Sequence, residues 1–478
     1  MKKVLVKIIS TPWFPIVFCI GLVLSIVVSS KNTPVVFSSW DLCWMFFILL
    51  GIIVTLWWVV FLVLKSGSWS GIFSVLSVLL VCVLLKGSAV LVFTLLVSAL
   101  VTLVWGKKIN WTGCTIGANL VALVLVVVLG ISVYRVSLIP TTSYKSISDL
   151  PQGVTGTLPD IYLLILDTYP SIKETQDQFG VNNHVFVDEL RSRSLKVTEN
   201  YTTSYLLTMF SMTSILNMNY PITYPDPEFL FGKSEVLNTL DSLGYTSILL
   251  GSGWYPTAYS KYFDYNLQVR YSGLEGFKQL VLFRGRGVYG TEVSFRKSVP
   301  YQFDELDKVG SRPESTFVFA HMQGLHPPMC FGPDGLSPKS GLSKSELFAG
   351  QLDYVNTRVL EFLDSVDNLN SSIVIITSDH GSFLEDSPLI DSCVPNLSDP
   401  EWIHFIVSRL VGFQAIYIPG CSDLSTLDLI QPNVFRTIFR QYFNISYPNL
   451  ESKNYFVKER CVGTSMEAFE VTNLLEVK

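Results

Sequence analysis

The sequence predicts an α/β fold in which an N-terminal region of five transmembrane helices precedes a domain with a doubly wound, mostly parallel sheet. Two observations indicate this organisation. Of the 478 residues, 49% are hydrophobic and only 15% are charged, and the apolar excess lies before residue 137. After residue 160, short apolar runs alternate with helix-length segments, as in parallel sheets whose strands are connected by helices. We expect a transmembrane domain over residues 1–137, a linker rich in Ser, Thr, Pro and Gly over 138–159, and an extracytoplasmic domain over 160–478.

The first part of the chain contains five apolar segments that approach or exceed the length needed to cross a bilayer. None of them contains Asp, Glu, Lys or Arg, and they are Trp13–Ser30, Leu42–Leu64, Trp69–Leu85, Ser88–Trp105 and Thr115–Tyr134. Most lysines of the short loops fall on the side of the N-terminus, so the positive-inside rule places that side in the cytoplasm. Five crossings then place the residues after 137 outside. We therefore expect a multi-pass protein of the plasma or inner membrane.

The overall charge and the cysteines give less information about binding partners and disulfides. The net charge of −5 gives no reason to expect a nucleic-acid partner. Four cysteines fall in the outer domain, where disulfides form readily, but their spacing indicates no pairing: Cys330, Cys393, Cys421 and Cys461.

The first elements of the outer domain follow from apolar runs and breaker residues. Ile161–Leu166 is a continuous apolar run, which predicts a strand buried on both faces. A polar, helix-compatible stretch follows, and Leu195–Val197 predicts a short strand. Tyr201–Met218 is a hydroxyl-rich approach to an apolar helix. Glu235–Leu250 predicts a helix, a stop at Gly244, and a strand.

The later elements continue the alternation. Thr316–Ala320 predicts a strand that leads into the segment HMQGLHPP. Ser343–Val366 predicts an amphipathic helix, and Ser343 and Glu346 have the spacing of a capping box at its start. Two further elements close the domain, a strand and a helix: Ala415–Ile418 and Asn433–Phe443.

Two buried strands end in metal-ligand residues. Asp167 directly follows Ile161–Leu166. Ser378, Asp379 and His380 directly follow the β-branched run Ile373–Thr377. Ligands of open α/β sheets bind at the carboxyl ends of the strands. Carboxylate oxygen and imidazole nitrogen suit a divalent cation, Zn²⁺ or Mn²⁺, between which the sequence does not choose. The alternative is a local turn in which His380 is hydrogen-bonded to its neighbours.

A nucleophile is available among the hydroxyls between Thr202 and Ser214. A metal near a Thr or Ser at a helix N-terminus lowers the pKa of the hydroxyl, and the helix end stabilises negative charge. The alternative is that these hydroxyls cap the helix or bond its backbone.

The order LILD, a hydroxyl-rich helix start, HPP and SDHG resembles the alkaline phosphatase superfamily. Within it, the sequence resembles membrane-anchored, sulfatase-like proteins, including lipoteichoic acid synthases and lipid A phosphoethanolamine transferases. The resemblance implies an extracytoplasmic, sulfatase-like catalytic domain outside five membrane helices. It also implies a role for each of five residues. Asp167, Asp379 and His380 match metal ligands, Thr208 matches the nucleophile and a further ligand, and His326 matches a histidine that contacts the phosphoryl group or a second metal.

Some positions stay open within this resemblance. Ser204 and Ser211 compete with Thr208 as the nucleophile, and no later histidine matches, so one or two metals remain possible. The first acid is Asp167, where the transferases carry Glu. No Cys-x-Pro-x-Arg pattern occurs, which argues against sulfate ester cleavage. We expect His184 and His321 to be structural, and Arg409 to form a surface ion pair rather than a phosphate fork.

The resemblance implies a metal-dependent transfer reaction. A phosphoryl-alcohol head group, of the phosphoethanolamine or phosphoglycerol type, would pass from a membrane phospholipid through Thr208 to a glycan or lipid of the cell envelope. Two alternatives remain. Water could replace the acceptor, which makes the protein a membrane-anchored phosphodiesterase or phosphatase, or the site could be degenerate and the protein a non-catalytic scaffold.

Overall fold

The computed structural model describes residues 143–144, 156, 158–198, 201–223, 227–232, 234–269, 292–309, 312–366, 369–382, 397–421, 429–457 and 468–475. All of them belong to one compact unit, Thr142–Val269 with Tyr289–Lys478. The five predicted membrane segments lie outside the described residues. Within the described ranges, no helix is both long enough and apolar enough to cross a membrane.

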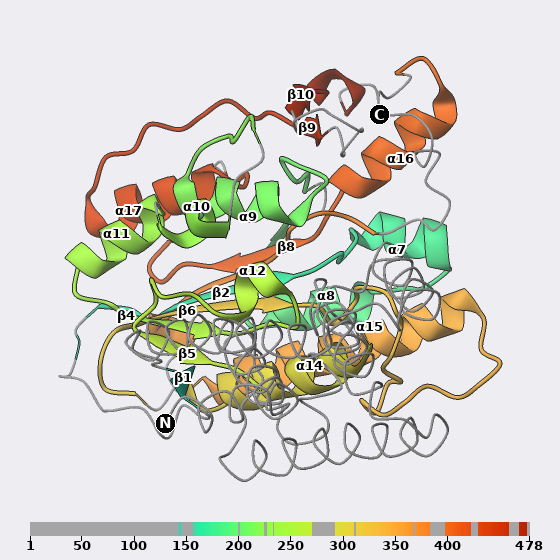
Figure 1. Ribbon diagram of the computed structural model, residues 1–478, viewed down its shortest axis with the longest axis horizontal. Helices are drawn as coiled ribbons and strands as arrows, with labels where there is room; N and C mark the ends of the chain where they lie inside the picture. The colour runs from blue at the N-terminus through green and yellow to red at the C-terminus, as the bar shows by residue number, and fades with distance from the viewer. Residues whose placement is uncertain are drawn as a thin grey trace, which may run out of the picture. The chain divides into compact units, whose positions relative to one another are not determined.

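An eight-stranded sheet forms the centre of the domain (Figure 1), in the order β1-β5-β4-β6-β2-β7-β8-β3. The strands are β1 Ser143–Tyr144, β2 Ile161–Leu166, β3 Lys196–Thr198, β4 Thr246–Leu250, β5 Tyr265–Leu267, β6 Thr316–Met322, β7 Ile373–Ser378 and β8 Gln414–Tyr417. Each neighbouring pair is parallel except the two pairs that involve β8, which runs antiparallel to both β7 and β3. The predicted α/β class with a mostly parallel sheet is confirmed, with β8 as the departure. Two short strands, β9 Tyr455–Val457 and β10 Ala468–Glu470, form a separate antiparallel pair.

Helices cover both faces of the sheet, as a doubly wound fold requires (Figure 1). One face packs against four helices: α9 Thr208–Asn217, α10 Pro227–Gly232, α11 Glu235–Ser242 and α17 Asn433–Phe443. The other packs against three: α8 His184–Ser192, α14 Glu292–Leu306 and α15 Lys344–Ser365. Three further helices lie at the edges: α7 Ile172–Phe179, α12 Tyr255–Ala258 and α16 Pro400–Leu410.

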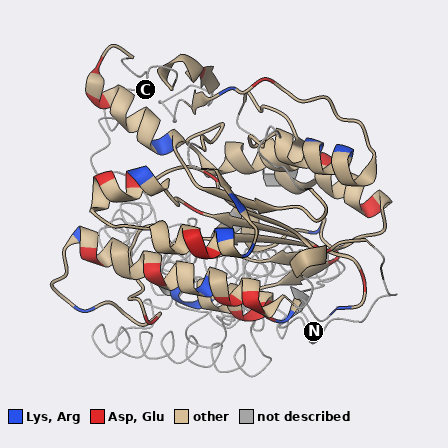
Figure 2. Cartoon of the chain, turned by 180° about the vertical axis from the view of Figure 1, so that it is seen from behind, with Lys and Arg blue, Asp and Glu red and all other residues tan. Residues whose placement is uncertain are grey.

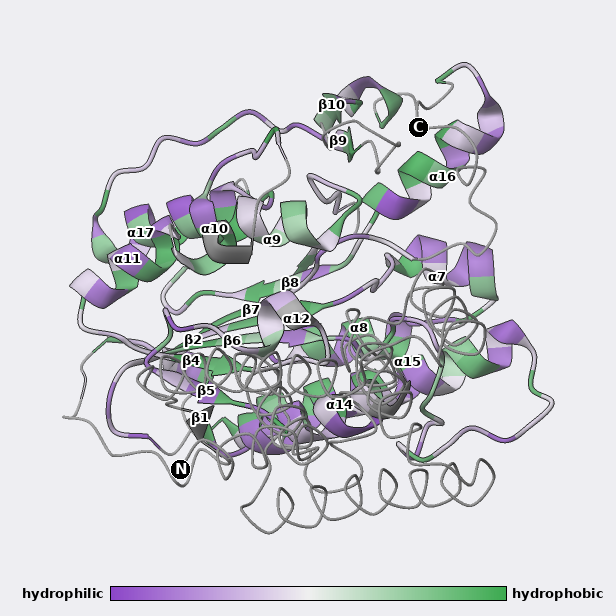
Figure 3. Cartoon of the chain, viewed as in Figure 1, coloured by the Kyte–Doolittle hydropathy of each residue, from purple (hydrophilic) through white to green (hydrophobic). Residues whose placement is uncertain are grey.

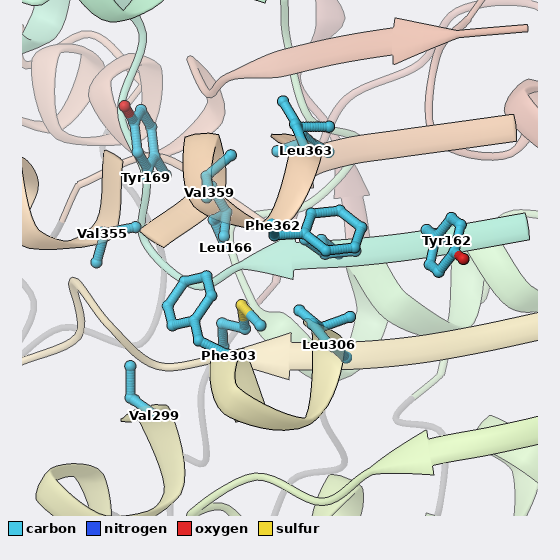
Figure 4. Close-up of a cluster of buried hydrophobic side chains, with 14 of the residues drawn as sticks. Tyr162, Leu166, Tyr169, Val299, Phe303, Leu306, Val355, Val359, Phe362 and Leu363 are labelled. Atoms are coloured by element: carbon cyan, nitrogen blue, oxygen red, sulfur yellow. The ribbon is translucent and has the colours of Figure 1, made fainter. Parts of the chain in front are cut away.

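Strand β2 divides its side chains between these two faces. Ile161, Leu163 and Ile165 belong to the cluster with α9 and α17, whereas Tyr162, Leu164 and Leu166 belong to the cluster with α14 and α15. Figure 4 shows the second cluster, in which Tyr162 lies edge-on to the ring of Phe362. Both sets are fully buried. A strand that is buried on both faces requires an uninterrupted run of apolar residues, as the sequence of β2 shows.

Charge and hydropathy follow the same division. Charged side chains gather on the flanking helices and connecting loops (Figure 2), while the central strands are mainly apolar (Figure 3). Local signals fix the helix ends. The capping box of Ser343 and Glu346 is present at the start of α15, and α11 ends just before Gly244, which has a φ of 82°. Such a positive φ is readily adopted by glycine.

The register of three strands positions the candidate ligands. Leu166 of β2 pairs with Ser378 of β7, so Asp167 and Asp379 each follow one member of the same pair. Ile165 pairs with His321 of β6 on the other side. Because side chains alternate along a strand, Asp167 continues the row of Ile161, Leu163 and Ile165, which faces α9. The carboxylates therefore emerge at the carboxyl edge of the sheet, on the side that α9 covers.

Candidate metal centre at the carboxyl edge of the sheet

Asp167, Asp379 and His380 lie together at this edge. One ligand atom from each lies within 4.8 Å of the others. The Nε2 atom of His380 is 3.3 Å from Asp379 Oδ2 and 3.9 Å from Asp167 Oδ1. All three side chains are buried, with 2% or less of their surface exposed. Three residues from two strand ends that are more than 200 positions apart in sequence thus converge on one point.

The donor set of this cluster fits a divalent cation. Asp167 Oδ1 and Asp379 Oδ2 are buried and have no hydrogen-bond partner among the described residues. The other oxygen of Asp379 accepts from the backbone N–H of Thr168 at 3.1 Å. His380 donates from Nδ1 to the carbonyl of Gly381 at 2.9 Å, which leaves Nε2 as the unprotonated, ligating nitrogen. Buried carboxylate oxygens without donors are costly, and a cation would satisfy both of them.

The electrostatics of the cluster lead to the same conclusion. Burial alone would raise the pKa of Asp167, but His326, His321 and His380 outweigh it and hold this pKa well below its usual range. Burial and then the charge of Asp167 raise the pKa of Asp379 to about 7. Burial, followed by the positive charge of Arg409, lowers the pKa of His380 to about 3. The cluster therefore combines a carboxylate, a second carboxyl group that a neighbouring negative charge keeps from ionising, and a neutral imidazole.

Thr208 places its hydroxyl against this cluster. It is the first residue of α9, and its Oγ1 lies 3.3 Å from His380 Nε2. The hydroxyl also contributes to lowering the pKa of Asp379. The backbone N–H groups of the first helical turn and the helix dipole favour negative charge at this position. Thr208 therefore places a hydroxyl next to the candidate metal ligands, at a helix end that stabilises negative charge.

The two competing hydroxyls have other surroundings. Ser211 is fully buried, and its Oγ donates to the carbonyl of Tyr205 at 3.1 Å. Ser204 is buried in the segment before α9, and its backbone N–H donates to Gln431 Oε1 at 2.7 Å. The structure therefore brings Thr208 to the cluster and holds Ser211 on a backbone carbonyl.

His326 lies beside the cluster without being one of its three ligands. It is half-buried in the loop after β6, donates from Nδ1 to the carbonyl of Pro327 at 2.6 Å, and lies edge-on to Phe295 at a ring distance of 5.6 Å. Its positive charge contributes to lowering the pKa values of Asp167 and His380.

His321 is a residue of the site that the sequence reasoning missed. It is fully buried, and its Nε2 lies 3.2 Å from Asp167 Oδ2. Its Nδ1 contacts Thr257 Oγ1 at 2.9 Å. The predicted strand ended at Ala320, whereas β6 extends to Met322. The alternation of Phe317, Phe319 and His321 on one face was the available signal, because Phe317 and Phe319 pack with α9.

Arg409 is not the surface ion-pairing residue that the sequence suggested. Only 3% of it is exposed, and its Nη2 donates to the carbonyl of Leu206 at 2.7 Å. It lies in the last turn of α16, and its own carbonyl accepts from the N–H of Gly381 at 2.7 Å. A Cβ at position 381 would clash with the carbonyl of Ser408, so this close approach requires glycine. The prediction of a surface ion pair is wrong because the last turn of α16 packs against Leu206, which precedes α9, and Gly381, which follows β7. The remaining two histidines, His184 and His404, are exposed.

Comparisons with known proteins find similarity in structure alone. No protein-family model and no curated protein sequence matches the chain. Among solved structures, the C-terminal periplasmic domain of EcEptC from Escherichia coli matches with a TM-score of 0.42 and 13% identity, over 67% of this chain and 97% of that one. A second structure of that domain is a complex with Zn.

Two further structures are similar to this chain. The lipoteichoic acid synthase LtaP from Listeria monocytogenes matches with a TM-score of 0.39 and 11% identity, over 63% of this chain and 78% of that one. The soluble domain of lipooligosaccharide phosphoethanolamine transferase A from Neisseria meningitidis matches with the same TM-score and identity, over 63% and 92%. A protein in the alkaline phosphatase superfamily from Vibrio parahaemolyticus also matches, with a TM-score of 0.35 and 12% identity, over 56% of this chain and 62% of that one.

Proposed function

We propose that this protein is a metal-dependent transferase that moves a phosphoryl-alcohol head group from a membrane phospholipid to a glycan or lipid of the cell envelope. The observation that supports this most strongly is the Thr208 hydroxyl, 3.3 Å from His380 Nε2, at a helix N-terminus. His380 Nε2 in turn lies 3.9 Å from Asp167 Oδ1 and 3.3 Å from Asp379 Oδ2, two buried oxygens without a hydrogen-bond partner among the described residues. A nucleophile, a cation site and an anion-stabilising helix end are the three parts that displacement at phosphorus needs.

The chain's own residues supply the ligands. Asp167, Asp379 and His380, together with the Thr208 oxygen, would hold one Zn²⁺ or Mn²⁺ ion. When bound, such an ion lowers the pKa of the Thr208 hydroxyl and withdraws charge from the phosphoryl oxygens. His321 and Thr168 orient the two carboxylates, the first by its contact with Asp167 Oδ2 and the second through its N–H to Asp379 Oδ1.

The reaction proceeds in two displacements. In the first, Thr208 Oγ1 loses its proton to water and attacks the donor phosphorus, and the bond from phosphorus to the diacylglycerol oxygen breaks. His326 donates a proton to that leaving oxygen. In the second, an acceptor hydroxyl attacks the same phosphorus, its proton passes to His326, and the Thr208 oxygen leaves. Two in-line displacements retain the configuration at phosphorus.

The donor and acceptor follow from the predicted placement of the domain. A catalytic domain outside the membrane and tethered by five helices has direct access to phospholipid head groups and envelope acceptors, whereas a soluble hydrolase needs no such tether. Phosphatidylethanolamine and phosphatidylglycerol are the two donors that we consider. If water serves as the acceptor, the same site is a phosphodiesterase.

The test is to trap the covalent adduct. Full-length protein in detergent with Zn²⁺ is mixed with either labelled phospholipid, quenched, and analysed by intact mass and peptide mapping. We expect a mass increase of one phosphoethanolamine or phosphoglycerol group on a peptide that contains Thr208. Thr208→Ala should abolish the adduct and donor turnover, and Ser211→Ala should retain both because its hydroxyl bonds Tyr205.

Three outcomes would change the proposal. An adduct on Ser204 or Ser211 would move the nucleophile. Adduct formation followed by release of the free head group, with no transfer to envelope acceptors, would favour the phosphodiesterase. Full activity of Thr208→Ala would refute the mechanism.

A further inference from the structure

Two of the loops that contribute to the candidate centre are far apart in sequence, and buried side chains tie them together. The first loop precedes α9 and ends at Thr208. The second follows β7 and contains Asp379 and His380. The side chain of Gln431, which lies just before α17, bridges them. Its Nε2 donates to the backbone carbonyl of Asp379 at 3.0 Å, and its Oε1 accepts from the backbone N–H of Ser204 at 2.7 Å.

We propose that Gln431 is a positioning residue that sets the distance between the Thr208 hydroxyl and the Asp379–His380 pair. This inference rests on the proposed reaction at Thr208. Gln431 touches neither the ligand atoms nor the hydroxyl, so it acts through the two backbones that it joins.

A glutamine carboxamide is well suited to this role. One loop presents a backbone N–H and the other a backbone carbonyl, so the bridge needs one acceptor and one donor at fixed separation. Gln431 is fully buried, so water does not replace either hydrogen bond. Gln431 also contributes to lowering the pKa of the buried phenol of Tyr201, at the start of the first loop. The side chain therefore has partners in the loop before α9 and in the loop after β7.

The bridge is anchored on a rigid support. Gln431 directly precedes Pro432 and α17, and the apolar side chains of α17 pack in the same cluster as those of α9. A displacement of Gln431 would thus require α17 to move against α9. Close-packed helices resist such shifts.

A second link runs parallel to the first. The guanidinium of Arg409 donates to Leu206 O at 2.7 Å, and its carbonyl accepts from Gly381 N–H at 2.7 Å. Gln431 therefore joins residues 204 and 379, and Arg409 joins residues 206 and 381, so the two links flank His380 and hold the segment just before Thr208. Gln431 is the better test because Arg409 also lowers the pKa of His380 by its charge.

The experiment compares Gln431→Met with a matched control, Asn433→Leu. Gln431→Met keeps the length of the side chain and removes both hydrogen bonds. Asn433 is also a fully buried amide that bridges two backbone groups, the N–H and carbonyl of Leu450 at 2.9 and 2.8 Å, and both of these hydrogen bonds lie outside the two loops of the site. Gln431→Asn keeps the amide but is too short to span both partners. Full-length proteins in detergent with Zn²⁺ are assayed for release of labelled diacylglycerol from phosphatidylethanolamine and phosphatidylglycerol.

If Gln431 positions the two loops, its variants should show a specific kinetic pattern. Gln431→Met should lower kcat and kcat/KM together by about 10- to 100-fold, as losses of supporting hydrogen bonds around a metal site do. Asn433→Leu should lower the melting temperature comparably but retain the wild-type kcat. Hydrogen exchange of peptides that contain Ser204 should speed up in Gln431→Met and not in Asn433→Leu. Gln431→Asn, which can keep only one hydrogen bond, should fall between wild type and Gln431→Met, and it provides the readout if Gln431→Met does not fold.

The outcomes separate this inference from the proposed function. Wild-type kcat in Gln431→Met, or an equal loss of kcat in Asn433→Leu, would overturn the positioning role. If the wild-type protein releases no diacylglycerol and forms no adduct, the proposed function is wrong. In that case unchanged exchange at Ser204 in Gln431→Met would also refute the bridge, and faster exchange would support it.

Discussion

Replacing Asp379 by Asn should stabilise the metal-free protein and destabilise the metal-loaded one. Asp379 is fully buried, and burial together with the charge of Asp167 raises its pKa from 3.8 to about 7. Ionising this group in the metal-free protein at pH 8 therefore costs about 4 kcal/mol, since each pKa unit corresponds to about 1.4 kcal/mol. An asparagine carries no charge and still accepts the hydrogen bond from Thr168 N–H that Asp379 Oδ1 now accepts.

The pH dependence has a definite sign. Between pH 4 and 7 the folded protein holds the Asp379 proton more tightly than the unfolded chain does, because the folded-state pKa is the higher one. The stability that this group contributes is therefore present at low pH and lost as the pH rises through that window. The advantage of Asp379→Asn over wild type in chelator should be largest at pH 8 and shrink towards pH 5.

Thermal unfolding of the full-length protein, followed by tryptophan fluorescence in detergent, measures this effect. In chelator at pH 8, Asp379→Asn should unfold up to about 6 °C above wild type, because an unfolding entropy of about 2.1 cal/mol/K per residue makes 1 kcal/mol shift the midpoint of a domain of about 320 residues by about 1.5 °C. With saturating Zn²⁺ the order should reverse, because wild type gains binding free energy that the variant lacks. A lower midpoint for the variant in chelator at every pH would refute the reasoning about the two carboxylates.

Two other predictions concern the same cluster. The affinity for Zn²⁺ should fall about tenfold for each pH unit below 7, because Asp379 must lose one proton whereas His380 is already neutral. Titration calorimetry in buffers of different ionisation enthalpy measures the released protons, and release of two near pH 6 would contradict the assignment. His321→Leu should weaken Zn²⁺ binding at pH 7 by about 10- to 100-fold, because His321 helps hold Asp167 ionised and in place. Equilibrium dialysis measures this affinity, and an unchanged value would leave His321 as a packing residue.

The sequence predicts the sheet and the ligand pair well because their signals are local. The runs Ile161–Leu166 and Ile373–Thr377 are apolar, short and bounded by polar residues, and the structure places them as β2 and β7 with nearly the same bounds. The signal for the start of α15 is also local, because Ser343 and Glu346 form the reciprocal hydrogen bonds of a capping box within one turn. The antiparallel direction of β8 has no such local signal, because it depends on how the chain returns after α16 rather than on the residues of the strand.

The supporting residues of the site escaped prediction for the same reason. The predicted strand ended two residues too early, before His321, so the place of this side chain beside Asp167 was not recognised. Gln431 and Arg409 carry no local signal at all, since the partners of their side chains lie 52 to 227 positions away along the chain. Sequence pattern indicates candidate ligands at strand ends, but the side chains that hold those ends together become evident only from the folded arrangement.

Anomalous diffraction from crystals of the full-length protein grown with Zn²⁺ or Mn²⁺ tests the central claim most directly. Data collected at the absorption edge of each metal locate the ion independently of the protein coordinates. The account predicts a peak about 2.0–2.2 Å from carboxylate oxygens of Asp167 and Asp379 and from His380 Nε2, with Thr208 Oγ1 beside it. A metal-loaded protein with no peak among these three residues, or with its peak elsewhere in the domain, would contradict the proposed centre.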